Sequence, residues 1–144
     1  MKTKIRPTPC RYCPYRRDVP SGVWAEEEYR KLPAYDNPTG QQPFEPFACH
    51  EVNQLLCAGW AQCEQAQKPG HELIALRLIQ FDSGEIVLRP PGKVPLFASG
   101  LDAAIHGLKQ LRRPGKAARL AMTYIVRLRA GQARARKERK ATCQ

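Results

Sequence analysis

The sequence predicts a small, mainly α-helical single domain with irregular loops, stapled by a metal centre. A chain of 144 residues suffices for one ordinary domain but not for two. Thirteen prolines and ten glycines divide it into short elements, which limits how much apolar surface regular structure can bury. Six cysteines supply the staple that a small, loop-rich core needs.

The N-terminal part is predicted to be a loop followed by one short helix. Residues 1–22 hold four prolines and should be irregular. Residues 23–32 have acids early and bases late, which suits the helix dipole. Trp24, Tyr29 and Leu32 would share one face of this helix.

The middle of the chain is predicted to be a long loop and then a helix. Residues 33–48 hold four prolines and read as extended chain, with Phe44 and Phe47 as apolar anchors. From there the chain turns into a helix over residues 57–67, which a Pro-Gly pair ends.

Residues 71–81 are rich in Leu, Ile and Ala and predict a mostly buried helix. The alternative is a short β-hairpin near residues 73–89, which would turn at an Asp-Ser-Gly sequence and return over residues 85–89. Periodicity alone does not separate a short buried helix from a strand, so both remain open.

Two more helices are expected near the C-terminus. Ser99 and Asp102 form a capping-box-like pair ahead of the first. The second should span residues 116–129, and residues 130–144 have no apolar stripe and predict a frayed helix or a disordered tail. The residues expected on the apolar faces of the two helices are Leu101, Ile105, Leu108 and Leu111, then Ala117, Leu120, Ala121, Tyr124 and Leu128.

The positive charge is concentrated in the last third of the chain. Lys and Arg number 12 against 12 Asp and Glu over residues 1–102, but 12 against 1 over residues 103–144. We therefore divide the chain into a metal-stapled helical domain, residues 1–126, and a basic tail, residues 127–144. Seven cations in the tail are candidates for nucleic-acid binding: Arg127, Arg129, Arg134, Arg136, Lys137, Arg139 and Lys140.

Such a tail would bind the phosphates of DNA or RNA with little sequence preference and strong salt dependence. An acidic protein surface is the alternative partner, and a solvated tail that aids solubility is the third interpretation. No membrane partner is expected, because the sequence has no run of about 18 apolar residues and no signal peptide. These features predict a reducing cytoplasm, where cysteines at ligand spacing hold metal more often than they form disulfides.

Four cysteines have the spacing of metal ligands. Cys10 and Cys13 form a C-x-x-C pair, in which one turn directs both sulfurs toward a single ion. Cys49 and Cys57 follow as two later single residues and complete a tetrahedral set. A thioredoxin-like redox pair is disfavoured, because the sequence predicts no strand before the C-x-x-C pair and no helix directly after it.

Two further side chains are alternative or supporting ligands. His50 adjoins Cys49 and would either replace it as a ligand or hydrogen-bond a ligand sulfur. The hydrogen-bonding role is preferred, because adjacent residues seldom bind one ion together. Cys63 is interpreted as a small buried residue, with a ligand role only if Cys57 points away. Cys143, in the charged tail, is the least suited of the six.

Zinc is the preferred cofactor, since four thiolates and no accessory redox feature suit it. A [4Fe-4S] cluster is the alternative, supported by Pro14 directly after Cys13 and by nearby aromatic side chains. Four thiolates would close every position on zinc, which argues against catalysis at the ion. The histidines form no recognisable triad, so an enzyme is the less favoured class.

The chain also resembles a known family. The resemblance covers about residues 6–113 and is to an uncharacterised family of small cysteine-motif proteins from actinobacteria and their phages, a domain of unknown function. It implies that Cys10, Cys13, Cys49, His50 and Cys57 form the central motif, and it implies a bacterial or phage-infected host cell, but it implies no activity. The segments that carry it are CPYRRDVPSGVW (13–24), KLPAYD (31–36), FACH (47–50), CAGWA (57–61), LIALRL (73–78) and PLFASG (95–100).

Taken together, the sequence predicts a small four-cysteine metal-binding protein with a nucleic-acid-associated binding or regulatory role. An iron–sulfur protein that senses redox state or processes nucleic acid is the alternative.

Overall fold

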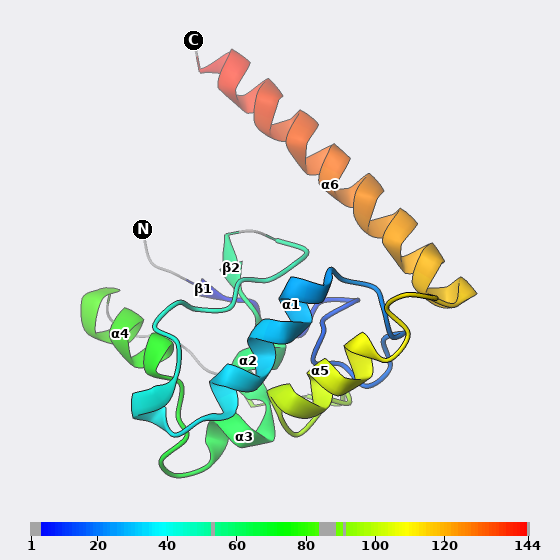
Figure 1. Ribbon diagram of the computed structural model, residues 1–144. Coiled ribbons are helices and arrows are strands. Elements are labelled where there is room, and N and C mark those ends of the chain that lie inside the picture. The colour runs from blue at the N-terminus through cyan, green and yellow to red at the C-terminus, as the bar shows by residue number, and fades with distance from the viewer. Residues whose placement is uncertain (1–3, 53, 84–88, 91, 144) are drawn as a thin grey trace.

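Helices dominate the computed structural model, which describes residues 4–52, 54–83, 89–90 and 92–143 (Figure 1). This confirms the mainly α fold class and the small single domain. The α-helices of the described residues are α1 (Glu26–Lys31), α2 (Ala58–Gln62), α3 (Glu64–Gln67), α4 (Ile74–Ser83), α5 (Gly100–Leu108) and α6 (Lys116–Thr142). The remaining elements are two 3-10 helices, η1 (Leu32–Asp36) and η2 (Thr39–Gln41), and two short strands, β1 (Lys4–Ile5) and β2 (Leu55–Leu56).

Helix α5 lies beside α1 (Figure 1), and it packs on α1 and on η1, which directly follows α1, through glycines. A Cβ atom at Gly107 would overlap the ring of Tyr29, and one at Gly100 would overlap the carbonyl of Leu32. Only glycine lets the backbone of α5 approach so closely. The buried face of α5 is therefore made of small residues.

The apolar face predicted for α5 is wrong in its first half. Leu101 and Ile105 are 51% and 60% exposed, whereas Ala103 and Ala104 are buried. Large side chains on the inner face would hold α5 away from α1, so the helix turns its leucine stripe partly outward. The expected cap is confirmed, because the Ser99 hydroxyl accepts a hydrogen bond from the backbone N–H of Asp102.

Asp36, at the end of η1, also caps α5. Its Oδ1 accepts from the N–H of Gly100 at 2.8 Å, and its Oδ2 accepts from the N–H of Leu101 at 2.7 Å. A carboxylate in this position satisfies two free N–H groups of the first turn and faces the positive end of the helix dipole.

We predict that Asp36→Ala lowers the free energy of unfolding by about 2 kcal/mol, because it removes both bonds to the helix N-terminus. Chemical denaturation measures this loss. Glu64→Ala is the matched control: Glu64 is also acidic but exposed, so the variant should remain within about 0.5 kcal/mol of the parent. Equal stability of the two variants would contradict the cap.

Residues 74–83 form helix α4, so the helix prediction is confirmed and the hairpin alternative is wrong for its first strand. The helix is not mostly buried as expected, because Leu78 and Phe81 are 46% and 94% exposed. Most of its second strand, residues 85–88, lies outside the described residues. The helix expected over residues 57–67 is divided into α2 and α3 at Cys63, which has extended backbone angles.

A parallel pairing of β1 and β2 was not predicted. Lys4 pairs with Leu55 and Ile5 with Leu56. Two-residue strands carry too little alternation to be recognised from sequence. The pairing brings the segment before Cys10 alongside the segment that leads to Cys57, and so brings the two cysteine-bearing parts of the chain together.

The largest fully buried side chains belong mainly to aromatic residues around the cysteines. Tyr15 and Trp60 are 1% and 0% exposed, and Phe47 is also buried. Phe44, predicted as a second anchor, is 72% exposed, so that prediction is wrong. In the part of the chain that the structure describes, no helix is long and apolar enough to cross a membrane.

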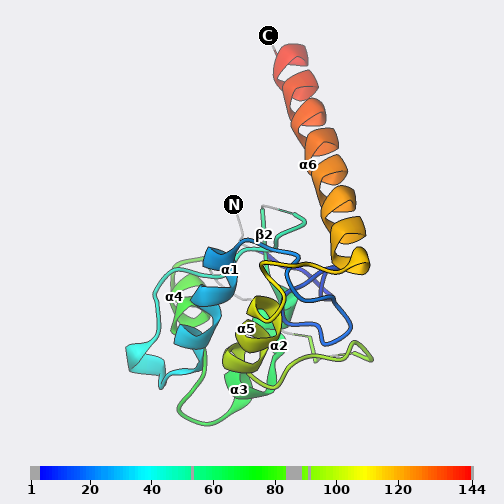
Figure 2. The ribbon, with the colours of Figure 1, turned by 45° about the vertical axis from the view of Figure 1, so that its right-hand side comes forward.

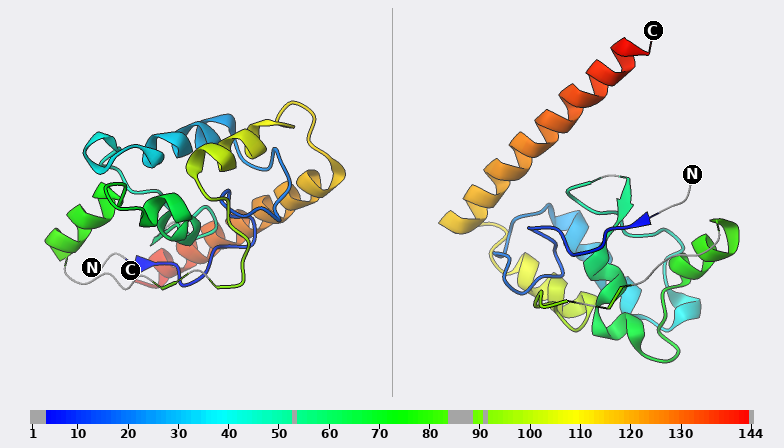
Figure 3. Two further views of the ribbon diagram at one scale, coloured as in Figure 1. Left: turned by 90° about the horizontal axis from the view of Figure 1, so that it is seen from below. Right: turned by 180° about the vertical axis from the view of Figure 1, so that it is seen from behind.

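Helix α6 runs without a break to Thr142, well beyond the end expected near residue 129. It crosses the proposed domain boundary at residues 126 and 127 as one helix. Its buried side chains are Ala118, Ala121 and Ile125, while Leu120, expected on the inner face, is 62% exposed. The second half of α6 extends beyond the rest of the chain (Figures 1 and 2), and the view from behind shows the same projection (Figure 3).

Candidate metal centre

The N-terminal cysteine pair lies in two consecutive turns. The N–H of Cys13 donates to the carbonyl of Cys10 at 3.1 Å, and the N–H of Arg16 donates to the carbonyl of Cys13 at 3.0 Å. The indole N–H of Trp24 donates to the carbonyl of Tyr12 at 2.7 Å and fastens this loop to the segment before α1. These turns place both cysteines in the interior.

The second pair is held by a narrow antiparallel bridge. Ala48 and Leu56 pair at its centre. On either side, the N–H of Cys49 donates to the carbonyl of Leu55, and the N–H of Cys57 donates to the carbonyl of Phe47. The bridge places Cys49 opposite Leu55 and Cys57 opposite Phe47, on two adjacent segments of the chain.

The four thiols form a chain of contacts in the order Cys49, Cys10, Cys13, Cys57. The Sγ atoms of Cys13 and Cys57 are 3.6 Å apart. The Cys10 thiol interacts with those of both Cys13 and Cys49. All four residues are at most 3% exposed. The structure thus brings together the four cysteines that sequence spacing selected.

Backbone N–H groups point at these sulfurs. The N–H of Val52 lies 3.5 Å from the Sγ of Cys49, and that of Trp60 lies 3.4 Å from the Sγ of Cys57, which caps α2. The backbone of Tyr15 does the same for Cys13. Such N–H donors disperse the charge of a thiolate and orient it, as they do around metal-bound sulfurs.

Gly59 makes room for the centre. A Cβ atom at this position would lie 2.6 Å from the Sγ of Cys13 and 2.7 Å from the Cβ of Tyr15. Sequence reasoning used the C-A-G-W motif but gave Gly59 no role. The sequence did contain a signal for this role, a glycine two residues after a proposed ligand cysteine. Glycine has no Cβ atom and therefore lets other side chains approach its backbone closely.

Without a metal ion the thiols of Cys10, Cys13 and Cys49 favour the neutral state. A hydrogen bond with Cys13 raises the pKa of Cys10 to about 12. Burial raises the pKa of Cys13 well above its usual range, and a hydrogen bond with Cys10, aided by burial, raises that of Cys49. Thiolates in this interior need a positive partner, which a metal ion supplies.

The fit to an ion is incomplete in the structure as it stands. Within the described residues, no group of three or more His, Cys, Asp or Glu side chains is arranged so that it could hold a metal ion. The 3.6 Å between the Sγ atoms of Cys13 and Cys57 is a thiol contact distance. It is also close to the separation of about 3.8 Å between two sulfurs that lie about 2.3 Å from one tetrahedral zinc. A cluster that gives each cysteine its own iron spaces the sulfurs more widely.

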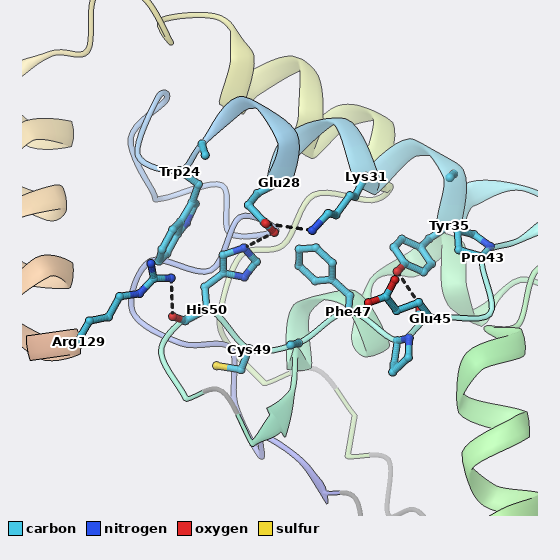
Figure 4. A pocket seen from close by; sticks show the side chains of 14 residues that line it. Trp24, Glu28, Lys31, Tyr35, Pro43, Glu45, Phe47, Cys49, His50 and Arg129 are labelled. Carbon is cyan, nitrogen blue, oxygen red and sulfur yellow. Dashed lines mark hydrogen bonds and ion pairs between the residues drawn. The ribbon is translucent and has the colours of Figure 1, made fainter. Parts of the chain in front are cut away.

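His50 points away from the thiols. Its Nε2 lies 2.8 Å from Oε2 of Glu28, and its ring packs between Trp24 and Phe47, with ring centroids 4.6 and 5.0 Å away. Figure 4 shows the ring directed toward α1 and the sulfur of Cys49 on the other side of the loop. The ring atom that faces Glu28 is thus not available to a sulfur.

The His50 ring borders a cavity of about 580 Å³. Burial lowers the pKa of His50, although the carboxylate of Glu28 opposes that shift. Burial acts to raise the pKa of Glu28 itself, but its bonds with Lys31 and His50 outweigh this effect and hold the pKa below its usual range. Part of the cavity wall is therefore a polar network of His50, Glu28 and Lys31, and Cys49 also lines this cavity.

A family model matches residues 5–129, and it describes a family of unknown function, DUF6283. The chain belongs to this family. The match includes all four thiols of the contact chain and ends at Arg129. It confirms membership of a family of unknown function and does not test the actinobacterial or phage origin. Comparisons with curated proteins and with solved structures found no match.

The remaining cysteines of this DUF6283 chain lie outside the contact chain. Cys63 is 4% exposed, and its thiol donates to the carbonyl of Trp60 at 3.7 Å. Burial raises the pKa of Cys63 to about 11. Cys143 is exposed and directly follows the end of α6. These positions suit a buried packing residue and a surface thiol.

The seven tail cations of the DUF6283 chain all lie on α6, with the exposed Arg127 and Arg129 inside the family match and five beyond it. Arg129 contacts the body, where its guanidinium lies 5.5 Å from the ring centroid of Trp24 and donates to the carbonyl of His50 at 3.3 Å. From Ala133 to Cys143 every residue is exposed. The cations on this exposed part, which lies beyond the family match, are Arg134, Arg136, Lys137, Arg139 and Lys140.

Proposed function

We propose that this DUF6283 protein is a zinc-stapled nucleic-acid-binding protein. In this proposal Cys10, Cys13, Cys49 and Cys57 hold one zinc ion, and the exposed end of α6 binds phosphates. Four thiolates leave no open position on zinc, so the ion serves the fold and not a reaction. A reducing bacterial or phage-infected cytoplasm suits such a site, because thiols persist there.

Support for zinc over an iron–sulfur cluster comes from the spacing of the thiols. The 3.6 Å between the sulfurs of Cys13 and Cys57 suits one shared ion. Closing the site requires the Cys49 end of the contact chain to approach the Cys57 end. Metal analysis of anaerobically purified protein tests this choice: one equivalent of zinc in a colourless protein supports it, and visible absorbance with iron and sulfide indicates the cluster instead.

The observation that carries the nucleic-acid proposal is the projecting end of α6. We name residues 133–143 the basic arm; it holds five cations and a single acid, Glu138. An α-helix fits the major groove of DNA, and basic helices that extend from a folded body bind there. The cations occur on more than one side of the helix, which favours phosphate contacts over the reading of base edges.

We predict that removing four arm cations weakens the salt dependence of binding to duplex DNA. Each phosphate contact contributes about 0.9 to the slope of log K against log salt, so four lost contacts reduce the slope by up to about 3.6. Fluorescence anisotropy with a labelled duplex at several salt concentrations measures this slope. The arm variant contains Arg134→Gln, Arg136→Gln, Arg139→Gln and Lys140→Gln.

The matched control removes the same charge from exposed cations elsewhere and should retain the parent slope. An equal loss in both variants would assign binding to net charge and contradict the arm. Parallel titrations with single-stranded RNA and with polyglutamate separate the partners, and tighter binding to polyglutamate would indicate an acidic protein surface. The control contains Arg30→Gln, Lys68→Gln, Lys93→Gln and Lys109→Gln.

A further inference from the structure

The first cysteine loop packs on helix α6. The ring centroids of Tyr12 and Tyr124 are 5.5 Å apart in an edge-to-face arrangement. The guanidinium of Arg11 lies 5.0 Å from the centroid of Tyr124. Arg11 and Tyr12 are the two residues between Cys10 and Cys13, so the turn that presents both sulfurs inward presents its other side chains to α6.

The second cysteine loop packs on the same helix, two turns farther along. The carbonyl of Glu51 accepts from Nε2 of Gln132 at 2.7 Å, and the carbonyl of His50 accepts from Arg129. His50 and Glu51 directly follow Cys49. Both halves of the thiol centre therefore contact α6 through residues next to the sulfurs.

Within the part of the chain that the structure describes, few other contacts hold α6 to the body. The buried side chains of its 27 residues are Ala118, Ala121 and Ile125. Two alanines and one isoleucine bury little apolar area for so long a helix. The position of α6 thus depends on the two cysteine loops being held together, which is what an ion shared by their sulfurs would do.

We propose that metal binding at the four thiols docks helix α6, so that zinc occupancy controls the placement of the basic arm. This inference rests on the proposed zinc site and the proposed role of the arm. Because coupling between two equilibria is reciprocal, contacts that dock α6 must also strengthen zinc binding. That reciprocity allows a test on zinc-loaded, folded protein.

The undocking variant is Tyr124→Leu with Gln132→Ala, which removes the contacts of the Tyr124 ring with Arg11 and Tyr12 and the Gln132 bond to the second cysteine loop, and changes no charge. Its control is Thr123→Ala with Val126→Ala, two neutral changes at exposed positions of the same helix. Competition with a chromophoric zinc chelator measures the affinity. We expect zinc to bind about tenfold more weakly to the undocking variant, within the usual range of coupling, and the control to match the parent.

Hydrogen exchange over residues 116–132 of the zinc-loaded proteins supplies the second measurement, and exchange should rise in the undocking variant alone. Equal zinc affinity in the undocking variant and the control would overturn the coupling. Weaker zinc binding in the undocking variant, with no duplex binding by any form, would support the coupling and refute the nucleic-acid role. A parent protein that binds no zinc would overturn both proposals.

Discussion

Replacing Cys13 with serine is expected to abolish tight zinc binding and to leave the domain largely unfolded at 37 °C. Cys13 is fully buried and stands in the middle of the thiol chain, in contact with Cys10 and Cys57. A hydroxyl is a poor zinc ligand, and its burial without the ion adds a desolvation cost. Structural zinc binds peptides with apparent free energies of about 10–16 kcal/mol, which exceeds the net stability of most small domains.

Metal analysis and circular dichroism during heating measure the two effects. Cys63→Ala is the matched control, since Cys63 is also buried but lies outside the thiol chain, and Cys143→Ser tests an exposed thiol. Both should retain one equivalent of zinc, with a modest loss of stability for Cys63→Ala from the smaller side chain. A Cys13→Ser protein with full zinc and the parent melting temperature would refute the site.

The grouping of the four thiols was predictable from sequence because much of it is local. The C-x-x-C turn brings Cys10 and Cys13 together, and the short loop between Cys49 and Cys57 returns the chain to the segment of Cys49, where Ala48 pairs with Leu56. The environment of His50 was not predictable in the same way. Its partner Glu28 lies 22 residues earlier on α1, and only the tertiary packing of α1 on the loop brings the two together.

The wrong inner face predicted for α5 and the wrong end predicted for α6 both come from relying on hydrophobic periodicity. Hydrophobic periodicity identifies large apolar side chains, but α5 buries a face of glycine and alanine because close approach to Tyr29 and Leu32 requires small residues. In α6 the absence of an apolar stripe suggested fraying after residue 129. Ala, Arg and Lys are strong helix formers, however, and they continue the helix into solvent without packing.

For the basic arm, the sequence locates the cations and the structure shows how they are joined to the domain. The charge count alone located the cations but treated them as a tail separate from the domain. The structure joins them to the domain through one continuous helix whose first part contacts both cysteine loops. The proposed metal centre and the proposed nucleic-acid surface are therefore mechanically connected, which the sequence did not suggest.

Gly59→Ala is expected to weaken zinc binding by about 10- to 100-fold, although alanine is the better helix former. The added Cβ would lie 2.6 Å from the Sγ of Cys13 and 2.7 Å from the Cβ of Tyr15, and neither atom can move freely because both residues are buried. Overpacking of this kind costs about 1–3 kcal/mol, which here exceeds the gain of up to about 1 kcal/mol in helix propensity. A displacement of Cys13 would move a ligand sulfur and so lower the affinity for the ion. Each cost of about 1.4 kcal/mol corresponds to a tenfold loss of affinity.

Two other glycines separate this effect from general destabilisation. A Cβ at Gly131 meets nothing within 4 Å, so Gly131→Ala should keep the parent zinc affinity and raise helix stability. A Cβ at Gly107 overlaps the ring of Tyr29, so Gly107→Ala should lower the melting temperature by disturbing the packing of α5 on α1. If Gly59→Ala and Gly107→Ala weaken zinc binding equally for equal losses of stability, Gly59 acts through the fold alone. A loss of affinity confined to Gly59→Ala places the thiol of Cys13 in the metal site, because only that variant presses on its sulfur.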